Sequence, residues 1–493
     1  MMTLDLIHTA ETVPCQPWAR HVLSHEAWSG FFAAQTNAPL TLLALWADTV
    51  QVHALLLDNA ALNVIAVSTS IEEGRYPAVS PQHACAAPYE RIIADLWGHA
   101  ATGARDLRPW LDKGHWSQTR PMAVRPEPPR PQDSVAMLPE ADDDLMQLSL
   151  GPIHGRLDEA AQLRLQIKDG SVVAAEAQLG FTHKGTLMLM RGKAPRTAAR
   201  FAARLSGDAT VAHALAFSAA TEAALGVKPP ARAVALRAAL LEMERIASHL
   251  DTLAEVGRLT GAAVVWTRCG VLREQVSRAA ASAFGHRLMM DCVVPGGVAL
   301  DITDAAQTTI RRALGEIATE LPSLRRLHNE GAFAARLTGV GRVAQPLLRH
   351  HAAGGPAARA AGCSFDARAM GQDMPFKSVS RGGGDALARQ HLRIEEIAMS
   401  LDIIGTRLRT LPEGQLTVAL PQESGEGIGF SESARGDIWH WLRLDHGQIA
   451  ACFLRDPGWA LWPVAEAALV HAPAEDVGLI KASFALPASG VDL

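Results

Sequence analysis

The sequence lacks any C-x-x-C pair. Its six cysteines stand singly, at positions 15, 85, 269, 292, 363 and 452. This spacing predicts neither a zinc knuckle nor a local iron–sulfur site. The cysteines do not cluster, so we expect reduced thiols that pack as small apolar side chains, as is typical of a cytoplasmic protein.

Long apolar runs are also missing. No window of about 18 uninterrupted apolar residues occurs, and a membrane-spanning helix needs roughly that length. The first residues, MMTLDLIHTAETVPCQPW, carry acidic groups and no basic segment ahead of an apolar stretch, so we expect no signal peptide. The sequence therefore predicts a cytoplasmic chain that does not cross a membrane itself but is free to attach to a membrane complex.

An excess of basic residues is absent as well. The chain has 46 Lys and Arg against 51 Asp and Glu, which argues against a nucleic-acid-binding face. No G-x-G-x-x-G dinucleotide fingerprint follows a strand pattern. The glycine-rich stretch RGGGDALAR (381–389) is better explained as a loop before a helix, with Asp385 near the helix start.

The 493 residues are enough for two or three domains. Five prolines lie between 121 and 131, and the acidic PEADDD stretch follows at 139–144, a composition that favours an extended linker. We therefore expect a small domain over 1–120, a linker over 121–145 and a large domain over 146–493.

The hydrophobic periodicity predicts an α+β fold. In the first domain, which reads as α/β, we expect strands in 41–58 and 62–70 and a helix in 87–100. In the second we expect a helical core with small antiparallel sheets at both ends. Its predicted elements are a hairpin over 161–180 that turns at Asp169–Gly170, helices over 229–257, 267–285, 304–328 and 384–409, and strands over 436–444 and 449–455.

Six stretches of the large domain occur in the order seen in one protein family. They are GPIHGRLDEAAQLRLQ (151–166), LGFTHKG (179–185), RLSGDATVAHALAF (204–217), LEMERIASHL (241–250), RAAGCSFDAR (359–368) and SARGDIWHWL (433–442). Together they resemble the large subunit of membrane-bound [NiFe] hydrogenases and its relative, the quinone-site subunit of complex I (NADH:quinone oxidoreductase).

The N-terminal stretch YERIIADLWGHAATGARDLRPWL (89–111) resembles the small accessory subunit of complex I. That family shares an E-R-x-x-x-D-L-[FW]-G helix and a following D-L-R turn. The matching residues here are Glu90, Arg91, Asp95, Leu96, Trp97, Gly98, Asp106, Leu107 and Arg108. The two modules in this order resemble the large subunit of formate hydrogenlyase-type complexes.

The resemblance implies where a nickel–iron centre would lie. The hydrogenases hold it with two C-x-x-C pairs, and soft thiolate ligands suit these metals. The first pair falls on Ser206 and Ala209, and the second falls within 481–493, which contains no cysteine. A hydroxyl and a methyl group cannot replace bridging thiolates, so we expect no metal in this chain.

The resemblance also implies a quinone site, built in complex I from a histidine on the first hairpin and a tyrosine beside the 206–209 turn. The only tyrosines here are Tyr76 and Tyr89, both in the first domain. Gln162 stands in the place of the hairpin histidine. The remaining candidates for a cavity that binds a polar headgroup are His154, Glu159, Gln162, His183, Ser206, Asp208, His213 and Arg435, with Asp208 the candidate catalytic group.

A structural role is an alternative for His183 and Arg435 and for one further polar residue, Glu244. His183 is more simply explained as a hydrogen-bonding turn residue. Glu244 is predicted to accept from Arg245 or His249 on the same helix face, with a proton-linked coupling role as the alternative. Arg435, which matches an arginine above the hydrogenase metal site, is expected to neutralise Asp208 or Glu159, because an unpaired buried charge is costly.

The resemblance implies a peripheral subunit of a respiratory, membrane-bound oxidoreductase, on the inner face of the cytoplasmic membrane. It would shape a quinone-type acceptor cavity beside a [4Fe–4S] cluster held by a small partner subunit, and couple electron transfer to ion-translocating membrane subunits. The alternative is a non-catalytic scaffold derived from a hydrogenase. Whether the chain itself catalyses a reaction stays open at this point, and a quinone is the only ligand expected for it.

Overall fold

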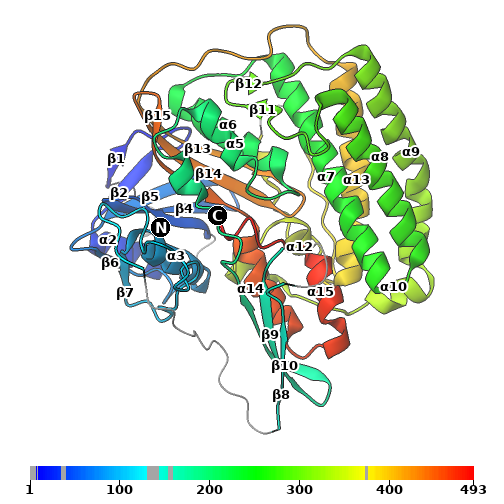
Figure 1. Ribbon diagram of the computed structural model, residues 1–493, viewed down its shortest axis with the longest axis horizontal. Helices are drawn as coiled ribbons and strands as arrows, with labels where there is room; N and C mark the ends of the chain where they lie inside the picture. Colours follow the sequence, from blue (N-terminus) through cyan, green and yellow to red (C-terminus); the bar gives the residue numbers. More distant parts are fainter. Residues whose placement is uncertain (1–6, 8, 35–39, 130–143, 154–158, 372–375) are drawn as a thin grey trace.

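The computed structural model describes residues 7, 9–34, 40–129, 144–153, 159–371 and 376–493. A sheet from the N-terminal part lies at one side of the molecule, and a group of long helices lies at the other (Figure 1). A second sheet, from the C-terminal part, lies between them (Figure 1). The α+β class expected from the sequence is confirmed.

The N-terminal sheet has five strands in the order β1-β2-β5-β4-β3. Its pairs are antiparallel except β2 with β5, which run parallel. The elements of this part are β1 (Glu11–Val13), β2 (Arg20–Leu23), α2 (His25–Ala34), β3 (Leu40–Ala47), β4 (Gln51–Asp58), β5 (Asn63–Ser70), β6 (Arg75–Pro77), α3 (Ala87–Trp97) and β7 (Ala100–Thr102). The apolar run at 41–58 is thus two strands with a turn between them, and the helix predicted in 87–100 is confirmed.

Helix α3 holds the loop that follows it. The Asp95 carboxylate accepts hydrogen bonds from the backbone N–H groups of Trp110 and Leu111, at 2.7 and 2.8 Å. Arg91 donates to the backbone carbonyls of Arg108 and Pro109. These charged side chains pair with backbone groups of the loop that would otherwise lack partners. Asp95 and Arg91 of α3 therefore fix the position of the loop at 108–111.

The predicted hairpin at 161–180 is confirmed as β9 (Gln162–Lys168) and β10 (Ser171–Gln178), and β8 (Met146–Leu150) completes the antiparallel sheet. Asp169 and Gly170 both have positive φ, at 50° and 76°. A two-residue hairpin turn with this geometry fits the right-handed twist of the strands.

The helical part is built on four long helices, α7 (Ala231–Leu259), α8 (Ala263–Phe284), α9 (Asp304–Asn329) and α13 (Ala386–Arg409). They pack side by side (Figure 1), and each was predicted within a few residues. Asp385 caps α13 by accepting from the Ala388 N–H, so the glycine-rich stretch is a loop before a helix, as predicted. Shorter elements are α4 (Thr186–Met190), α5 (Pro195–Ala202), β11 (Val293–Val294), β12 (Gly297–Val298), α10 (Gly331–Leu337), α11 (Gln345–His350), α12 (Gly355–Arg359), α14 (Gly458–Leu469) and α15 (Val477–Phe484).

The C-terminal sheet consists of β13 (Gly425–Glu432), β14 (Asp437–Asp445) and β15 (Gln448–Arg455), all antiparallel. Helix α6 (Thr210–Leu225) lies directly on β13. The first half of that strand alternates glycine with other residues, and a Cβ at Gly427 or Gly429 would come within 2.2 Å of an α6 backbone carbonyl. Glycine therefore allows the helix that follows the 206–209 turn to contact the strand closely.

Aromatic packing joins the two sheets. Trp46 of β3 stacks on Phe453 of β15, with ring centroids 5.4 Å apart, and Trp46 also contacts Trp441. One continuous hydrophobic core contains residues of both the N-terminal and the C-terminal sheets. The proposed boundaries at 120 and 145 remain a prediction from composition, and much of that linker lies outside the described residues.

Candidate functional site: an acidic turn beside a cavity

The turn at 206–209 lies between α5 and α6. Ser206 and Ala209 are buried, whereas the Asp208 side chain keeps 31% of its surface exposed. The Ser206 hydroxyl donates to the Asp208 carboxylate at 2.5 Å. Helices α5 and α6 fix the backbone at the two ends of the turn. The hydrogen bond from Ser206 then orients the Asp208 carboxylate.

Arg435 connects this turn to a second, fully buried carboxylate. Its Nε donates to Asp208 Oδ2 at 2.6 Å and its Nη1 donates to Asp456 Oδ1 at 2.7 Å. The ion pair with Asp208 expected from the sequence is confirmed, and Asp456 was not foreseen. Burial opposes ionisation of Asp456, but Arg435 and His213 outweigh it and hold the pKa of this carboxyl well below its ordinary value.

Two buried histidines extend the chain of contacts. His213 Nε2 lies 3.1 Å from Asp456 Oδ2, and His213 Nδ1 lies 3.0 Å from His440 Nε2. Since ionised Asp456 can only accept, His213 donates from Nε2. Burial and the neighbouring His213 lower the pKa of His440 well below its ordinary value. The candidate His213 therefore lies behind the turn and orients Asp456.

The C-terminal segment packs against the same turn. Ser489 Oγ lies 3.4 Å from Ser206 Oγ, and it donates to Glu159 Oε1 at 2.5 Å. The Ser489 N–H also donates to Glu159 at 2.6 Å. This contact brings 481–493 to the 206–209 turn, where the resemblance implied a second pair of ligands.

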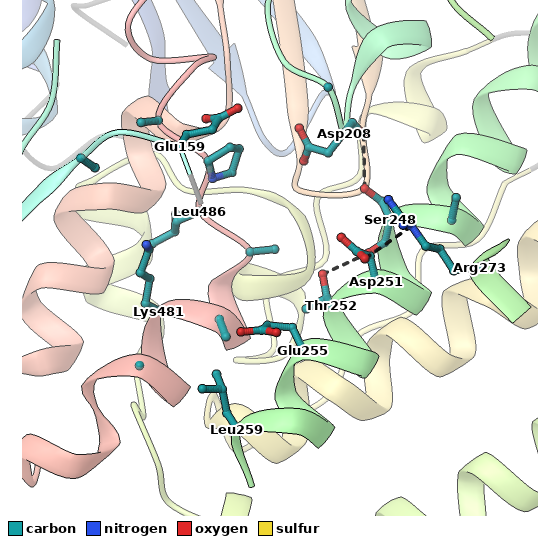
Figure 2. A pocket seen from close by; sticks show the side chains of 18 of the residues that line it. Glu159, Asp208, Ser248, Asp251, Thr252, Glu255, Leu259, Arg273, Lys481 and Leu486 are labelled. Atoms are coloured by element: carbon teal, nitrogen blue, oxygen red, sulfur yellow. Dashed lines mark hydrogen bonds and ion pairs between the residues drawn. The ribbon is translucent and has the colours of Figure 1, made fainter. Parts of the chain in front are cut away.

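A cavity of about 680 Å³ opens at the turn. Figure 2 shows Glu159 and Asp208 at one end, with α7 side chains along one wall and α15 opposite. The polar lining residues are Glu159, Asp208, Glu244, Ser248, Asp251, Thr252, Glu255, Arg273, Ser277, Arg287 and Lys481. The apolar ones include Leu150, Leu163, Leu259, Met289, Val477, Leu486 and Trp462. The cavity is thus large enough for a small aromatic headgroup.

Glu244 has partners other than those predicted. Its carboxylate accepts from the backbone N–H groups of Val211 (2.6 Å) and Ala212 (3.0 Å), at the start of α6. Arg245 instead pairs with Glu242, and His249 pairs with Glu396, so the prediction of a same-helix partner was wrong. The reason is that successive α7 residues face different neighbours, and the unsatisfied N–H groups of α6 lie closest to Glu244.

Burial raises the pKa of Glu244 to about 8, and the neighbouring Asp208 adds to this rise while the two N–H donors oppose it. Because the pKa of Glu244 is higher in the folded than in the unfolded chain, its contribution to the free energy of unfolding is fully present below the unfolded value of about 4.5. That contribution is lost as the pH rises through about 8.

We expect Glu244→Gln to flatten the pH dependence of stability. Between pH 5.5 and 7.5 the free energy of unfolding of the wild type should fall relative to the variant by roughly 2 to 3 kcal/mol. Urea unfolding at several pH values measures this difference, and all other titrating groups cancel in the comparison. Parallel pH profiles for the two proteins would contradict the assignment.

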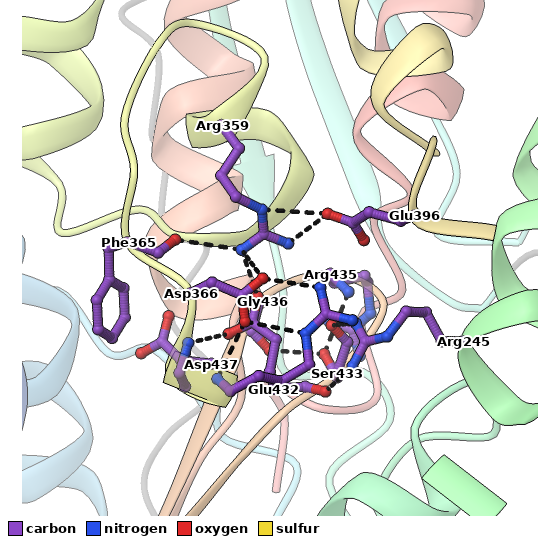
Figure 3. A network of polar contacts seen from close by, with 12 residues as sticks. Arg245, Arg359, Phe365, Asp366, Glu396, Glu432, Ser433, Arg435, Gly436 and Asp437 are labelled. Carbon is purple, nitrogen blue, oxygen red and sulfur yellow. Dashed lines mark hydrogen bonds and ion pairs between the residues drawn. The ribbon is translucent and has the colours of Figure 1, made fainter. Parts of the chain in front are cut away.

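Behind the turn, α7 and α13 share a buried network of charges (Figure 3). Arg359 pairs with Glu396 at 2.6 Å and with Glu432 at 2.7 Å. Arg245 donates to the backbone carbonyls of Glu432 and Ser433. The network ties α7, α12, α13 and β13 together immediately beside Arg435.

Three other candidates, Gln162, His183 and Arg435, do not line the cavity. Gln162 donates to Ser149 Oγ at 2.8 Å, and it does not line the cavity. His183 stacks on Trp116 and lies 2.6 Å from the backbone carbonyl of Asp492, which is the turn role expected for it. Arg435 reaches the cavity only through Asp208. His154 lies outside the described residues.

The cysteines are free thiols. Cys269 and Cys452 are buried, and burial raises the pKa of each to about 12, so these thiols are not poised as metal ligands. Within the described part of the chain, no group of three or more His, Cys, Asp or Glu side chains is arranged to hold a metal ion. The described residues therefore do not fit a nickel–iron centre.

Comparison with known proteins places this geometry in a family. Residues 256–424 match the model of the respiratory-chain NADH dehydrogenase 49 kDa subunit. A subunit of the NADH-quinone oxidoreductase from Salinispora tropica is 30% identical over 60% of this chain and 80% of the relative. The chain belongs to the 49 kDa subunit family.

Other relatives of this 49 kDa family member have hydrogenase names. Formate hydrogenlyase subunit 5 of Escherichia coli is 27% identical over 85% of this chain and 77% of the relative. The membrane-bound hydrogenase subunit alpha of Pyrococcus furiosus is 28% identical over 62% of this chain and 76% of the relative. The broad resemblance predicted from the sequence is confirmed.

A solved structure supports the fold. A chain from the membrane-bound sulfane sulfur reductase, described as an archaeal respiratory membrane complex, matches with a TM-score of 0.66 and 25% identity. The match covers 71% of this chain and 99% of that chain. Members of the 49 kDa family are thus subunits of multisubunit, membrane-associated complexes. No helix among the described residues is long and apolar enough to span a membrane.

Proposed function

We propose that this chain is a peripheral subunit of a membrane-bound respiratory oxidoreductase, and that its cavity receives the headgroup of a quinone-type electron acceptor. The observation that carries this proposal is the 680 Å³ cavity at the 206–209 turn. Where the hydrogenase relatives would hold metal, the turn here presents Asp208, flanked by Ser206 and Ala209.

The cavity walls suit such a molecule. Apolar side chains such as Leu163, Leu259 and Trp462 can contact a ring and an attached chain, while charged groups contact its oxygens. Electrons would arrive from a [4Fe–4S] cluster in a small partner subunit, as the resemblance implies. This chain would shape the acceptor site, and the partner would supply the redox centre.

The buried charges supply a route for coupling. Arg435, which pairs with Asp208, donates its backbone N–H to Ser433 Oγ, and the Ser433 carbonyl accepts from Arg245 of the charged network. A change of charge in the cavity would alter the balance of these buried ion pairs, because electrostatic interactions are strong where water is excluded. We propose that this network transmits the change to ion-translocating membrane subunits on the inner face of the cytoplasmic membrane.

A scaffold without chemistry is the second candidate. It is favoured by the absence of tyrosine from residues 90–493, since the complex I mechanism uses a tyrosine beside this turn. In that case the cavity would be a remnant, and the chain would only dock its neighbours. Binding of a quinone analogue separates the two candidates, because a scaffold gives no saturable response.

Purification from native membranes in mild detergent tests the assignment as a subunit. We expect a tagged chain to be isolated together with an iron–sulfur protein and with membrane-embedded subunits, all identified by mass spectrometry. A chain that is isolated alone and monomeric, with no iron–sulfur partner, would contradict the proposal.

A further inference from the structure

The end of the cavity at the 206–209 turn carries two carboxylates, each held by a serine. Ser206 Oγ donates to Asp208 at 2.5 Å, and Ser489 Oγ donates to Glu159 at 2.5 Å. A hydroxyl has one proton, so each serine has already committed its proton to a carboxylate. The two hydroxyl oxygens lie 3.4 Å apart behind the carboxylates, and neither serine lines the cavity.

The other donors at this end are committed in the same way. The Ser489 N–H donates to Glu159 at 2.6 Å. Arg435 directs Nε and Nη2 at Asp208 and Nη1 at Asp456. The Ser248 hydroxyl donates to the backbone carbonyl of Asp208. Of these groups, Glu159 and Asp208 line the cavity and Ser206, Ser489 and Arg435 do not, so the side chains of these contacts that face a ligand are the two carboxylates.

Cationic side chains line other parts of the cavity. Arg273 of α8 contacts Asp251 of α7 at 3.4 Å, and Lys481 extends from α15 on the opposite wall (Figure 2). Asp251 and Glu255 of α7 also line this part of the cavity, so cations and carboxylates occur together there. A polar group that lies at the turn contacts the carboxylate oxygens of Glu159 and Asp208.

We propose that this end of the cavity is selective for a ligand group that donates hydrogen bonds, so that a hydroquinone is bound more tightly than the corresponding quinone. This inference rests on the proposed function and specifies the form of the ligand. A hydroquinone hydroxyl donates to Glu159 or Asp208, and a hydrogen bond to an ionised acceptor is among the stronger ones. A quinone carbonyl can only accept, and it would face lone pairs.

The inference is tested by calorimetric titration of the purified intact complex under anaerobic conditions, without electron donor or acceptor. The probes are a short-chain benzoquinone and the hydroquinone prepared from it. We expect the hydroquinone to bind about tenfold or more tightly, as one additional charge-assisted hydrogen bond would give. Equal affinities, or tighter binding of the quinone, would overturn the inference and leave the proposed function standing.

Two variants test whether Glu159 causes the preference for the hydroquinone over the quinone. Glu159→Gln keeps one oxygen for the Ser489 N–H and replaces the acceptor of the Ser489 hydroxyl by an amide NH2, which a carbonyl can use, so the preference for the hydroquinone should shrink to a few-fold. Asp402→Asn, on the exposed side of α13, is the matched control and should retain the full preference. An unchanged preference in Glu159→Gln would overturn the assignment. Failure of both probes to bind saturably to the wild-type complex would instead contradict the proposed function.

Discussion

Replacing Arg359 with methionine should lower the free energy of unfolding by about 3 to 5 kcal/mol, which is typical when one partner of a buried ion pair is removed. Arg359 is fully buried and contacts three carboxylates, those of Asp366, Glu396 and Glu432. Methionine fills much of the same volume but leaves these acids without their shared cation. Urea unfolding of the full-length chain measures the loss.

The effect is large because Arg359 is the shared cation of several buried carboxyl groups. Burial, together with Asp366, raises the pKa of Glu432 to about 7 even with Arg359 present. Without the guanidinium, Glu432 and its neighbours must take up protons or carry unpaired charge in a buried site. The variant should therefore lose more stability at pH 8 than at pH 6.

Arg268→Met is the control for this prediction. Arg268 pairs with Glu320 at 3.2 Å, but both side chains are more than one third exposed. Surface pairs of this kind contribute about 0 to 1 kcal/mol. If Arg359→Met destabilised the chain no more than Arg268→Met, Arg359 would not be the electrostatic link between α12, α13 and β13 that we describe.

Filling the cavity from α15 should abolish most of its ligand binding. Gly478 lines the cavity, and a Cβ at this position would meet only Leu259 Cδ2, at 3.9 Å. Gly478→Leu would therefore place its side chain beside Leu259, in the space that the chain attached to the headgroup needs. We expect the affinity of the intact complex for a quinone analogue to fall about tenfold or more, a loss readily measured by titration.

Folding should not suffer from this change. Leucine is a better helix former than glycine, and Gly478 lies in the first turn of α15 with no positive φ. Gly405→Leu is the matched control, because Gly405 is an exposed helical glycine of α13 with nothing within 4 Å of an added Cβ. Equal binding by the two variants would show that the ligand lies elsewhere.

Much of the fold followed from periodicity alone. The helices α7, α9 and α13 have apolar residues at helical spacing over more than twenty positions, so their type was clear and only their ends shifted by one or two residues. Strand β13 was not predicted as a separate element. Its G-x-G-x-G pattern has low strand propensity, and the pattern is explained only by the α6 backbone, which lies against it.

The site was predictable where the chemistry is local or strongly constrained. A buried arginine needs a carboxylate, so the pairing of Arg435 with Asp208 could be anticipated. Asp456 and Ser489 could not, because they reach the turn across 243 and 283 residues of chain, to His213 and Ser206 respectively. The Asp-Pro-Gly sequence at 456–458 predicts a turn, and its buried carboxylate becomes apparent only in three dimensions.

The central claim is that the turn at 206–209 belongs to an acceptor cavity and not to a metal site. Titration of the intact wild-type complex with a quinone analogue, with nickel measured in the same preparation, tests this most directly. The account predicts saturable, inhibitor-sensitive binding and no stoichiometric nickel. A complex that binds no analogue, or one that carries a nickel atom in this chain, would contradict it.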